Sequence, residues 1–317
     1  MQKKQLWGYM LSLSNHMWAD ESTRPTLWYE DVPYSHEIDI DEITWDETVK
    51  ALAERKYNFV LIDVGDGIKY ESHSEISAPN AWEKDFLKKK LSEMRALGLE
   101  PIPKLNFSAC HDTWLKEYRR MISTPTYYRV CADLIREVCE VFDAPRIFHL
   151  GCDEENAEMQ KGYECITVRG EELWWHDLFF LFSECEKHGA RPWVWSDYAW
   201  RHEEVFLQKM PRSVLQSSWL YLPFKEYLAD SLQHKRIEIF EALDQKGYDQ
   251  ILTGSLYNNL RNMHQNVAFG RDRLTAGGLL GYMAAPWVST ASKNRYTLLD
   301  NAERLLEARK RFYPETL

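Results

Sequence analysis

The sequence contains no tract rich in proline, glycine or serine and no low-complexity segment. Glycine and proline are themselves scarce, with 14 and 12 residues among 317. Such tracts are the usual composition signal of a linker between domains. We therefore expect one domain over residues 1–317.

Paired cysteines and metal-binding spacings are also absent. The six cysteines show neither a C-x-x-C pair nor a zinc-finger spacing, and two of them, Cys131 and Cys139, fall inside one predicted helix. We expect free thiols. Nothing in the sequence calls for a cofactor or a bound metal.

Targeting and membrane segments are missing as well. The amino-terminal run MQKKQLWGYMLSL is short, interrupted and without a small-residue cleavage site, which favours a first β-strand over a signal peptide. No stretch has the length and apolarity of a transmembrane helix. These absences predict a cytoplasmic protein with no membrane partner.

Positive charge is in deficit, because 49 acidic residues face 39 lysines and arginines and the net charge is −10. A nucleic-acid backbone or an anionic membrane would be repelled by such a surface. We expect a neutral or small ligand. With 44% hydrophobic and 28% charged residues, the chain has the composition of a soluble globular protein with a large core.

Aromatic residues are abundant, with 13 Trp and 17 Tyr. Trp and Tyr offer flat apolar faces with a polar group at the edge, and sugars stack on such faces. The same residues can simply fill a large core. Only aromatic residues at strand ends therefore count as evidence for a carbohydrate site.

Short apolar runs alternate with longer segments of helical period, which is typical of parallel strands joined by helices. Eight such units predict a (β/α)8 barrel. The alternative, a doubly wound open sheet, usually has a glycine-rich phosphate loop after its first strand, and LSLSNHMWAD contains none. The predicted strands are 6–14, 58–64, 100–108, 145–151, 190–197, 213–219, 249–256 and 277–287.

Several helix boundaries are marked locally. T-W-D-E at Thr44 resembles a capping box, and Pro125 suits the first turn of another helix. Helices over about 82–97 and 170–188 are each closed by a glycine, Gly98 and Gly189.

The active site of such a barrel lies at the carboxyl ends of its strands. Carboxylates and indoles predominate there. Glycosidases use carboxyl groups to transfer protons and aromatic faces to stack on sugar rings. In chain order the residues at the strand ends are His16 and Trp18, Asp63 and Asp66, Asn106 and His111, Asp153, Glu154 and Glu155, Trp195 and Asp197, Trp219 and Tyr221, Tyr257 and Asn259, and Trp287.

The sharpest local feature is HLGCDEE (149–155), where acids directly follow an apolar strand. An isolated acidic run is more typical of a solvated loop or a helix cap, but the position at a barrel strand's carboxyl end favours function. Like charges in a partly buried cleft cannot all ionise easily, so one carboxyl is expected to stay protonated near neutral pH and serve as a general acid.

The run TGSLYNNL (253–260), after the seventh strand, contains no Asp or Glu. Most retaining barrel glycosidases place a carboxylate nucleophile there. Two routes remain open. One is inversion with a base elsewhere, such as Asp63 or Asp197, and the other is attack by the substrate's own 2-acetamido oxygen.

His149-Leu150-Gly151-Cys152-Asp153-Glu154 resembles the H-x-G-G-D-E hallmark of glycoside hydrolase family 20, the β-N-acetylhexosaminidases. The resemblance implies that Glu154 is the general acid and base and that Asp153 orients the acetamido group and stabilises an oxazolinium intermediate. It further implies a supporting pair, Asp63 and His111. The acetamido pocket would be lined by Trp195, Trp219 and Trp287, with Tyr257 bonding the acetamido oxygen.

Departures from the family pattern gather on the outer sugar hydroxyls. The strand-one Arg of the family is missing, and only Asn15 or His16 can replace it. Acids of the family are replaced by Asn259 and Ser289, and Asn106 stands where the family has Asp. The resemblance thus implies that the residues that bind the outer sugar hydroxyls differ from those of the family. The family's amino-terminal accessory domain has no counterpart in this sequence.

We assign the substrate-binding set as His16, Asn106, Trp195, Asp197, Trp219, Tyr257, Asn259 and Trp287. His149 is expected to pack inside its strand and support Asp153, and Trp193 to pack against a helix. Two other functions stay open. A catalytically inactive barrel would bind glycans through its Trp residues, and a metal-dependent hydrolase would use His16, His111 and the acids, although no H-x-H or H-E-x-x-H spacing occurs. The sequence leaves the sugar's identity and the oligomeric state undetermined.

Overall fold

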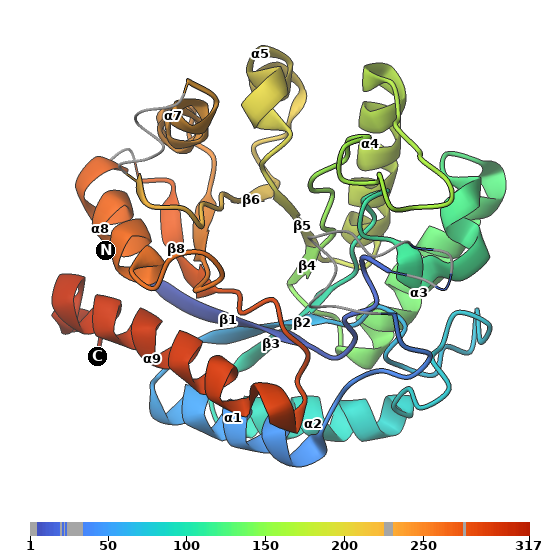
Figure 1. Cartoon of the computed structure of the whole chain (residues 1–317), viewed down its shortest axis with the longest axis horizontal. Helices are drawn as coiled ribbons and strands as arrows, with labels where there is room; N and C mark the ends of the chain where they lie inside the picture. The colour runs from blue at the N-terminus through green and yellow to red at the C-terminus, as the bar shows by residue number, and fades with distance from the viewer. Residues whose placement is uncertain (1–4, 20, 22, 24–33, 225–230, 275–276) are drawn as a thin grey trace.

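The computed structural model describes residues 5–19, 21, 23, 34–224, 231–274 and 277–317. Its centre is a closed barrel of eight parallel strands in chain order, β1 to β8, with helices around it (Figure 1). The predicted (β/α)8 barrel is confirmed. The strands are β1 (Leu6–Ser12), β2 (Phe59–Asp63), β3 (Glu100–Lys104), β4 (Ile147–His149), β5 (Arg191–Trp195), β6 (Leu215–Ser217), β7 (Gln250–Gly254) and β8 (Leu279–Ala284).

The helices follow the strands in the expected alternation. They are α1 (Glu42–Glu54), α2 (Lys84–Ala96), α3 (Pro125–Val141), α4 (Glu171–Lys187), α5 (Ala199–Lys209), α7 (Ser231–Gln245), α8 (Asn262–Arg273) and α9 (Arg295–Phe312), with short 3₁₀ segments at Thr113–Met121, Ser292–Asn294 and Pro314–Thr316. Part of the long loop expected after β1, residues 20, 22 and 24–33, lies outside the described residues.

Helix ends follow the local chemistry, with one correction. Helix α1 begins at Glu42, and its cap is the Asp41 carboxylate, which accepts hydrogen bonds from the Thr44 N–H at 2.8 Å and the Thr44 hydroxyl at 2.6 Å. The predicted capping box at Thr44 was wrong because the stronger acceptor lies three residues earlier. Pro125 opens α3 as expected, and Gly98 and Gly189 adopt the positive φ that ends α2 and α4.

The barrel interior is filled by alternate residues of the strands. Residues at every second position, such as Phe59 and Leu61 of β2, join one inward cluster with Ile102, Ile147 and Leu215. Trp193 belongs to this cluster together with Trp195, so the expectation that Trp193 packs against a helix was wrong. Residues two apart on a strand share a face, and both indoles point into the barrel.

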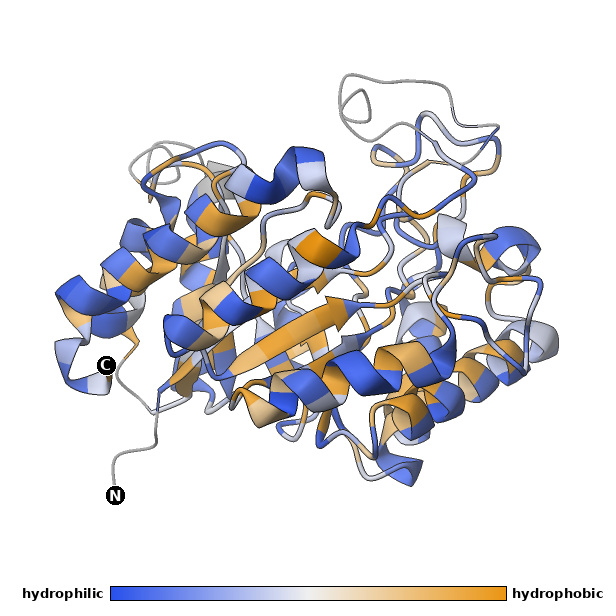
Figure 2. Cartoon of the chain, turned by 90° about the horizontal axis from the view of Figure 1, so that it is seen from below, coloured by the Kyte–Doolittle hydropathy of each residue, from blue (hydrophilic) through white to orange (hydrophobic). Residues whose placement is uncertain are grey.

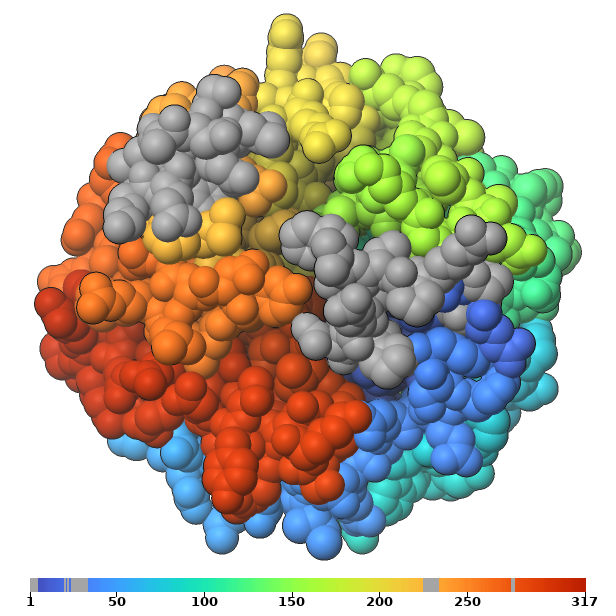
Figure 3. Space-filling view, in the orientation of Figure 1, coloured from blue at the N-terminus to red at the C-terminus, as the bar shows by residue number. Residues whose placement is uncertain are grey.

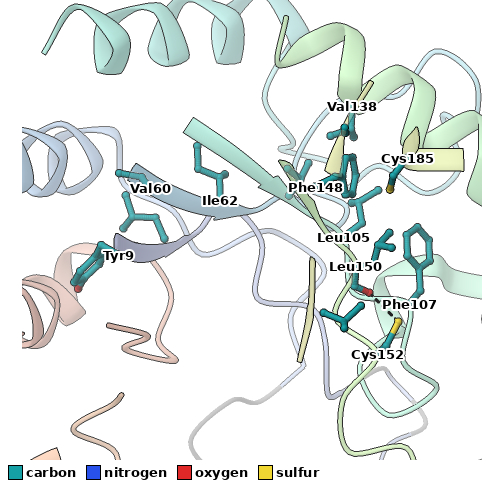
Figure 4. Packing of buried hydrophobic residues seen from close by; sticks show 14 of the residues in the cluster. Tyr9, Val60, Ile62, Leu105, Phe107, Val138, Phe148, Leu150, Cys152 and Cys185 are labelled. Carbon is teal, nitrogen blue, oxygen red and sulfur yellow. Dashed lines mark hydrogen bonds between the residues drawn. The ribbon is translucent and has the colours of Figure 1, made fainter. Parts of the chain in front are cut away.

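The other strand faces pack against the helices and form the larger core. Figure 4 shows Val60, Ile62, Leu105 and Phe148 among the helix-facing residues of this layer, with Val138 of α3 nearby. Figure 2 shows hydrophobic strands inside and helices whose hydrophilic residues face outward. Because the strands are buried on both faces and the helices on one, continuous apolar runs in the sequence mark the strands.

The barrel closes where β1 pairs with β8, in the register Leu6 to Gly281 and Tyr9 to Ala284. In Figure 3 the colours run round the molecule, and the last helix, α9, comes to lie beside the first, α1. Among the helices that the structure describes, none combines the length and apolarity needed to cross a membrane. All six cysteines are free thiols, as expected.

Candidate active site at the carboxyl end of the barrel

The chain turns sharply after β4, and this turn presents the two candidate acids. Gly151, Cys152 and Glu154 have positive φ values of 70°, 67° and 55°. Non-glycine residues in this region cost roughly 1–3 kcal/mol each and persist where surrounding contacts determine them. A Cβ on Gly151 would lie 2.0 Å from Asn106 Oδ1, so glycine is required there for space as well as for conformation.

The loop after β3 holds this turn from the side. Asn106 donates to Asp153 Oδ1 at 2.9 Å, and its own Oδ1 accepts from the Cys152 N–H at 3.3 Å. The Ser108 hydroxyl donates to the carbonyl of Asp153, and the Cys110 thiol donates to the carbonyl of Glu154. Asn106 therefore contacts both Asp153 and the turn that carries it, and its predicted role in substrate binding stays a prediction.

Asp153, Glu154 and His111 form a compact triad. His111 Nε2 lies 3.3 Å from Asp153 Oδ2 and 3.4 Å from Glu154 Oε2. Asp153 and His111 are buried, whereas the Glu154 side chain is 27% exposed. The exposed carboxyl can reach a bound molecule, and the buried one is available for close orientation of a ligand.

Contacts within this triad shift the pKa values of His111 and Asp153 in opposite directions. Burial alone would lower the pKa of His111, but the adjacent Asp153 and Glu154 carboxylates raise it to about 10. Burial alone would raise the pKa of Asp153, but the charges of His111 and Lys104 and the bonds from His111 and Asn106 lower it to about 2. At neutral pH Asp153 is thus a carboxylate and His111 an imidazolium.

A third carboxyl, Asp197 at the end of β5, lies behind the pair. Its Oδ2 accepts the Glu154 N–H at 2.8 Å, and its Oδ1 lies 3.4 Å from the Trp219 indole N–H, which donates to it. Burial, followed by the charges of Asp153 and Glu154, raises the pKa of Asp197 to about 7. The like-charge effect, expected within the acidic run, thus falls on Asp197, which lies outside that run.

Aromatic rings surround the acids. The rings of Trp195 and Trp287 are 5.8 Å apart, Tyr221 lies 6.4 Å from Trp287, and Trp219 stacks on Tyr221 at 4.9 Å. Trp18 lies 6.1 Å from His111, edge to face. Three of the predicted indoles, Trp195, Trp219 and Trp287, are therefore brought together at one end of the barrel.

A tyrosine, Tyr221, lies within this aromatic cluster. Burial raises the pKa of the Tyr221 hydroxyl well above its usual value, and the charges of Asp153, Glu154 and Asp197 add to the rise, which places this hydroxyl near the acids. Tyr257 is 52% exposed, and no ring contact joins it to the indoles in the described part of the chain. The role of Tyr257 was predicted from its position after β7 and stays a prediction, whereas Tyr221 was named only among the residues at the strand ends.

Two further predicted residues have other partners. Asp63 lies in the barrel interior and accepts a hydrogen bond from Lys104, so the expected pairing of Asp63 with His111 is not formed. Asn259 donates to Gln265 Oε1 at 2.6 Å and caps its own loop by accepting from the Arg261 N–H. Neither contact could be read from the strand-end positions.

His16 is held in a polar cluster beyond β1. Its Nδ1 lies 2.9 Å from Asp66 Oδ2, and Asp66 also accepts from the Ser14 hydroxyl at 2.5 Å and from Lys116 at 3.1 Å. His16 Nε2 is buried without a hydrogen-bond partner among the residues described. Buried polar atoms are usually paired, so this nitrogen is available to a ligand.

Ser289, two positions after Trp287, stands where family 20 has an acid, and it binds a carboxylate from another part of the chain. The Ser289 hydroxyl donates to Asp39 Oδ2 at 2.7 Å, and Lys293 lies 2.7 Å from the same oxygen. The bonds from Lys293 and Ser289 outweigh burial and lower the pKa of Asp39. Asp39 was missed because it lies in an irregular loop with no periodic signal.

His111, Asp153 and Glu154 also offer one ligand atom each within 4.8 Å of one another, which is close enough for a metal ion among the residues searched. A His and two carboxylates suit several divalent cations. In the present geometry the His111 imidazolium already contacts both acids. Metal binding would require His111 to lose its proton against a raised pKa.

No protein-family model matches the sequence, and no curated protein matches it either. Solved structures do match. The chain superposes on a chitobiase from Flavobacterium johnsoniae with a TM-score of 0.64, 16% identity and coverage of 99% of this chain and 52% of that one. The fold is that of the family 20 hexosaminidases.

Two further structures agree. The family 20 β-N-acetylhexosaminidase of Streptomyces coelicolor A3(2) gives a TM-score of 0.65 at 12% identity, with 94% of this chain and 63% of that one covered. Dispersin B gives 0.61 at 14% identity, with 97% and 99% covered. The chain thus spans about half to two thirds of the first two proteins and nearly all of the third. At these identities the likeness concerns the fold.

Proposed function

We propose that the protein is a glycoside hydrolase that releases a 2-acetamido sugar, with the acetamido group of the substrate acting as the nucleophile. The observation that carries the proposal is the contact of Asp153 and Glu154 with one imidazolium, His111, beside a cluster of Trp195, Trp287 and Tyr221. The likeness in fold to glycosidases supports the same class of activity.

In the first step Glu154 gives its proton to the glycosidic oxygen while the bond from C1 to that oxygen breaks. The acetamido oxygen of the substrate bonds to C1 and forms an oxazolinium ion. Asp153, ionised and buried, accepts the acetamido N–H and balances the positive charge that develops. In the second step water attacks C1, the oxazolinium opens, and the water's proton passes to Glu154.

His111 keeps both acids in place during this sequence because its Nε2 lies within 3.4 Å of each carboxylate. The aromatic cluster supplies apolar faces for the acetamido methyl and the pyranose ring. Asp39 and His16 are proposed to bind the outer sugar hydroxyls, Asp39 as a carboxylate acceptor and His16 through Nε2.

The loop after β7 contributes no Asp or Glu, which leaves inversion as the competing route for a hydrolase. Asp63 is occupied by Lys104, and Asp197 is the remaining candidate base. Proton NMR of the first anomer released from an N-acetyl-β-hexosaminide separates the two. We expect the β-anomer, whereas an initial α-anomer would exclude the acetamido mechanism.

The direct test uses 4-nitrophenyl N-acetyl-β-D-glucosaminide and the galactosaminide with wild-type protein and Glu154→Gln. We expect turnover by the wild type and a loss in kcat of about 10²–10⁴-fold in the variant, which retains the shape but not the proton. An acetamido thiazoline should inhibit the wild type competitively. Wild-type turnover in Glu154→Gln on the true substrate would remove Glu154 as the acid.

Calorimetry against a glycan panel covers the inactive alternative. Binding without turnover at high protein concentration would indicate a glycan-binding barrel in place of an enzyme. Activity that is lost with a chelator and restored by a divalent metal would instead favour the metal-dependent hydrolase. We expect chelation to leave activity unchanged, because the charge of His111 occupies the position between the two acids.

A further inference from the structure

The acidic run has a third member, Glu155, whose environment differs from that of the first two. Its side chain is 3% exposed and makes a two-point contact with Arg169. Arg169 Nε donates to Oε1 at 2.6 Å, and Nη2 donates to Oε2. Oε2 also accepts the Ala109 N–H at 3.3 Å. Bidentate pairs of this kind set geometry as well as charge.

Arg169 is equally buried, and its remaining contacts reach two other parts of the barrel. Nη1 donates to Asp177 of α4 at 2.9 Å, and Nη2 lies 3.4 Å from the carbonyl of Phe107 after β3, to which it donates. Asp177 in turn accepts from the hydroxyls of Ser123 and Tyr128. One guanidinium therefore joins the loops after β3 and β4 to helices α3 and α4.

This junction adjoins a strained residue. Glu154 has a φ of 55°, and the Glu155–Arg169 contact is the first side-chain anchor that follows it along the chain. On the other side, Cys110 and Ser108 hold the carbonyls of the same turn. A backbone held in a sparsely populated conformation needs such fixed contacts on both sides.

We propose that Glu155 and Arg169 form a positioning pair that holds the Glu154 carboxyl against His111, so that the third acid acts through its neighbour and does not touch the substrate. The role of the pair rests on the proposed function of Glu154. A displacement of about 1 Å at a catalytic group can cost on the order of 10²-fold in rate.

The test compares two neutral, isosteric variants of the two carboxylates that bind Arg169. In Glu155→Gln the amide N–H₂ faces either Arg169 Nε or Arg169 Nη2 with the Ala109 N–H, so a donor opposes a donor in both orientations and the two-point contact opens. In Asp177→Asn the amide N–H₂ at the Oδ1 position can donate to the Tyr128 hydroxyl, which also accepts, while the amide oxygen keeps the Ser123 hydroxyl and Arg169 Nη1. Arg169 also keeps its contact with Glu155.

We expect Glu155→Gln to lower kcat by about 10- to 100-fold while KM changes less than about threefold, since the acid is displaced but the binding groups are not. Asp177→Asn should stay within about twofold of the wild type in both constants. Arg169→Lys, which keeps the charge but loses the fork, should resemble Glu155→Gln. Urea unfolding of each variant identifies those that remain folded.

Equal losses of kcat in Glu155→Gln and Asp177→Asn, or an unchanged kcat in a folded Glu155→Gln, would overturn the positioning role. Crystal structures of the two variants report on it without turnover. The Glu154–His111 contact should be lost in Glu155→Gln and kept in Asp177→Asn. If the wild type cleaves no acetamido sugar, the proposed function fails, whereas an intact contact in both variants removes the positioning pair.

Discussion

At the scale of single residues, the site depends on which group carries each charge. Two carboxyls, Asp153 and Glu154, contact one imidazolium, and a third, Asp197, accepts the Glu154 N–H. The pKa values of Asp153 and Asp197 move in opposite directions. Asp153 has strong donors in His111 and Asn106, and Asp197 receives weaker ones. The charge of His111, together with hydrogen bonds, keeps Asp153 ionised, whereas burial and the charges of Asp153 and Glu154 raise the pKa of Asp197.

Asp197 predicts a pH dependence of stability. Its folded pKa of about 7 lies above the 3.8 of an unperturbed aspartate, so its contribution to stability is full below pH 3.8 and is lost as pH rises through 7. Asp197→Asn should remove this loss. Thermal unfolding from pH 4 to 8 should show a Tm difference that shifts in the variant's favour as pH rises. A difference independent of pH would contradict the raised pKa.

Asp39 predicts a specific change in substrate binding. Asp39→Asn should raise KM by about tenfold, close to the ~1.4 kcal/mol of one charge-assisted hydrogen bond, with a smaller effect on kcat. Asp41→Asn is the matched control two residues away, because asparagine caps helix α1 as well as aspartate does. Steady-state kinetics on the aryl glycoside measure both. Equal KM values for the two variants would exclude Asp39 from the sugar site.

At the scale of elements, the strand-to-loop turn after β4 differs from the helix ends around it. Gly98 and Gly189 close helices in open space, with no atom within 4 Å of an added Cβ. Gly151 has a similar φ but faces the Asn106 side chain. The same backbone conformation is therefore a simple helix stop in two places and a tightly packed turn in the third.

Alanine at these glycines should separate strain from crowding. Gly189→Ala should cost about 1–2 kcal/mol in the free energy of unfolding, from the left-handed conformation alone, and leave kcat unchanged. Gly151→Ala should cost more and lower kcat, because it pushes Asn106 away from Asp153. Urea denaturation and kinetics give the two quantities. Similar values for both variants would mean that the turn after β4 can relax.

At the scale of the whole molecule, the barrel interior changes character along its axis. Apolar residues such as Phe59, Leu61 and Ile102 fill one part, and a polar layer follows in which Asp63, Lys104 and His149 are register partners on β2, β3 and β4. Lys104 and Asp63 are almost completely buried. Their charge pair separates the packed interior from the acids at the carboxyl ends of the strands.

This interior pair should show strong coupling in unfolding. Lys104→Met alone leaves a buried carboxylate and should cost about 3–5 kcal/mol, whereas Lys104→Met with Asp63→Leu should recover most of that loss. Glu100→Gln, which breaks an exposed pair with Arg146, should cost less than about 1 kcal/mol. A double-mutant cycle by chemical denaturation measures the coupling. Additive effects would contradict a direct buried ion pair.

Much of the fold and part of the site could be predicted from local patterns. The eight apolar strands and the glycines that end α2 and α4 could be recognised because hydrophobic periodicity and helix-end signals each involve only a few neighbouring residues. The position of Asp153 and Glu154 at a strand's carboxyl end followed from the barrel rule, and Trp195, Trp219 and Trp287 followed in the same way.

The hydrogen-bond and ion-pair partners of the site residues could not be predicted from the sequence. Asp63 was expected to pair with His111 and pairs with Lys104, because register between β2 and β3 places these two side chains together inside the barrel. Tyr221 packs beside Trp287 and Asp39 binds Ser289, since loops from distant parts of the chain meet around Trp287. Local spacing carries no information about such contacts.

The amino-acid sequence by itself thus determined the barrel and the strand ends at which charged and aromatic residues emerge, because hydrophobic period and turn residues are local properties. Only the tertiary structure decided which acid is ionised, which tyrosine faces the acids and which carboxylate reaches Ser289. These depend on burial and on contacts between residues up to 250 positions apart, as for Ser289 and Asp39, and closure of the barrel is what brings them together.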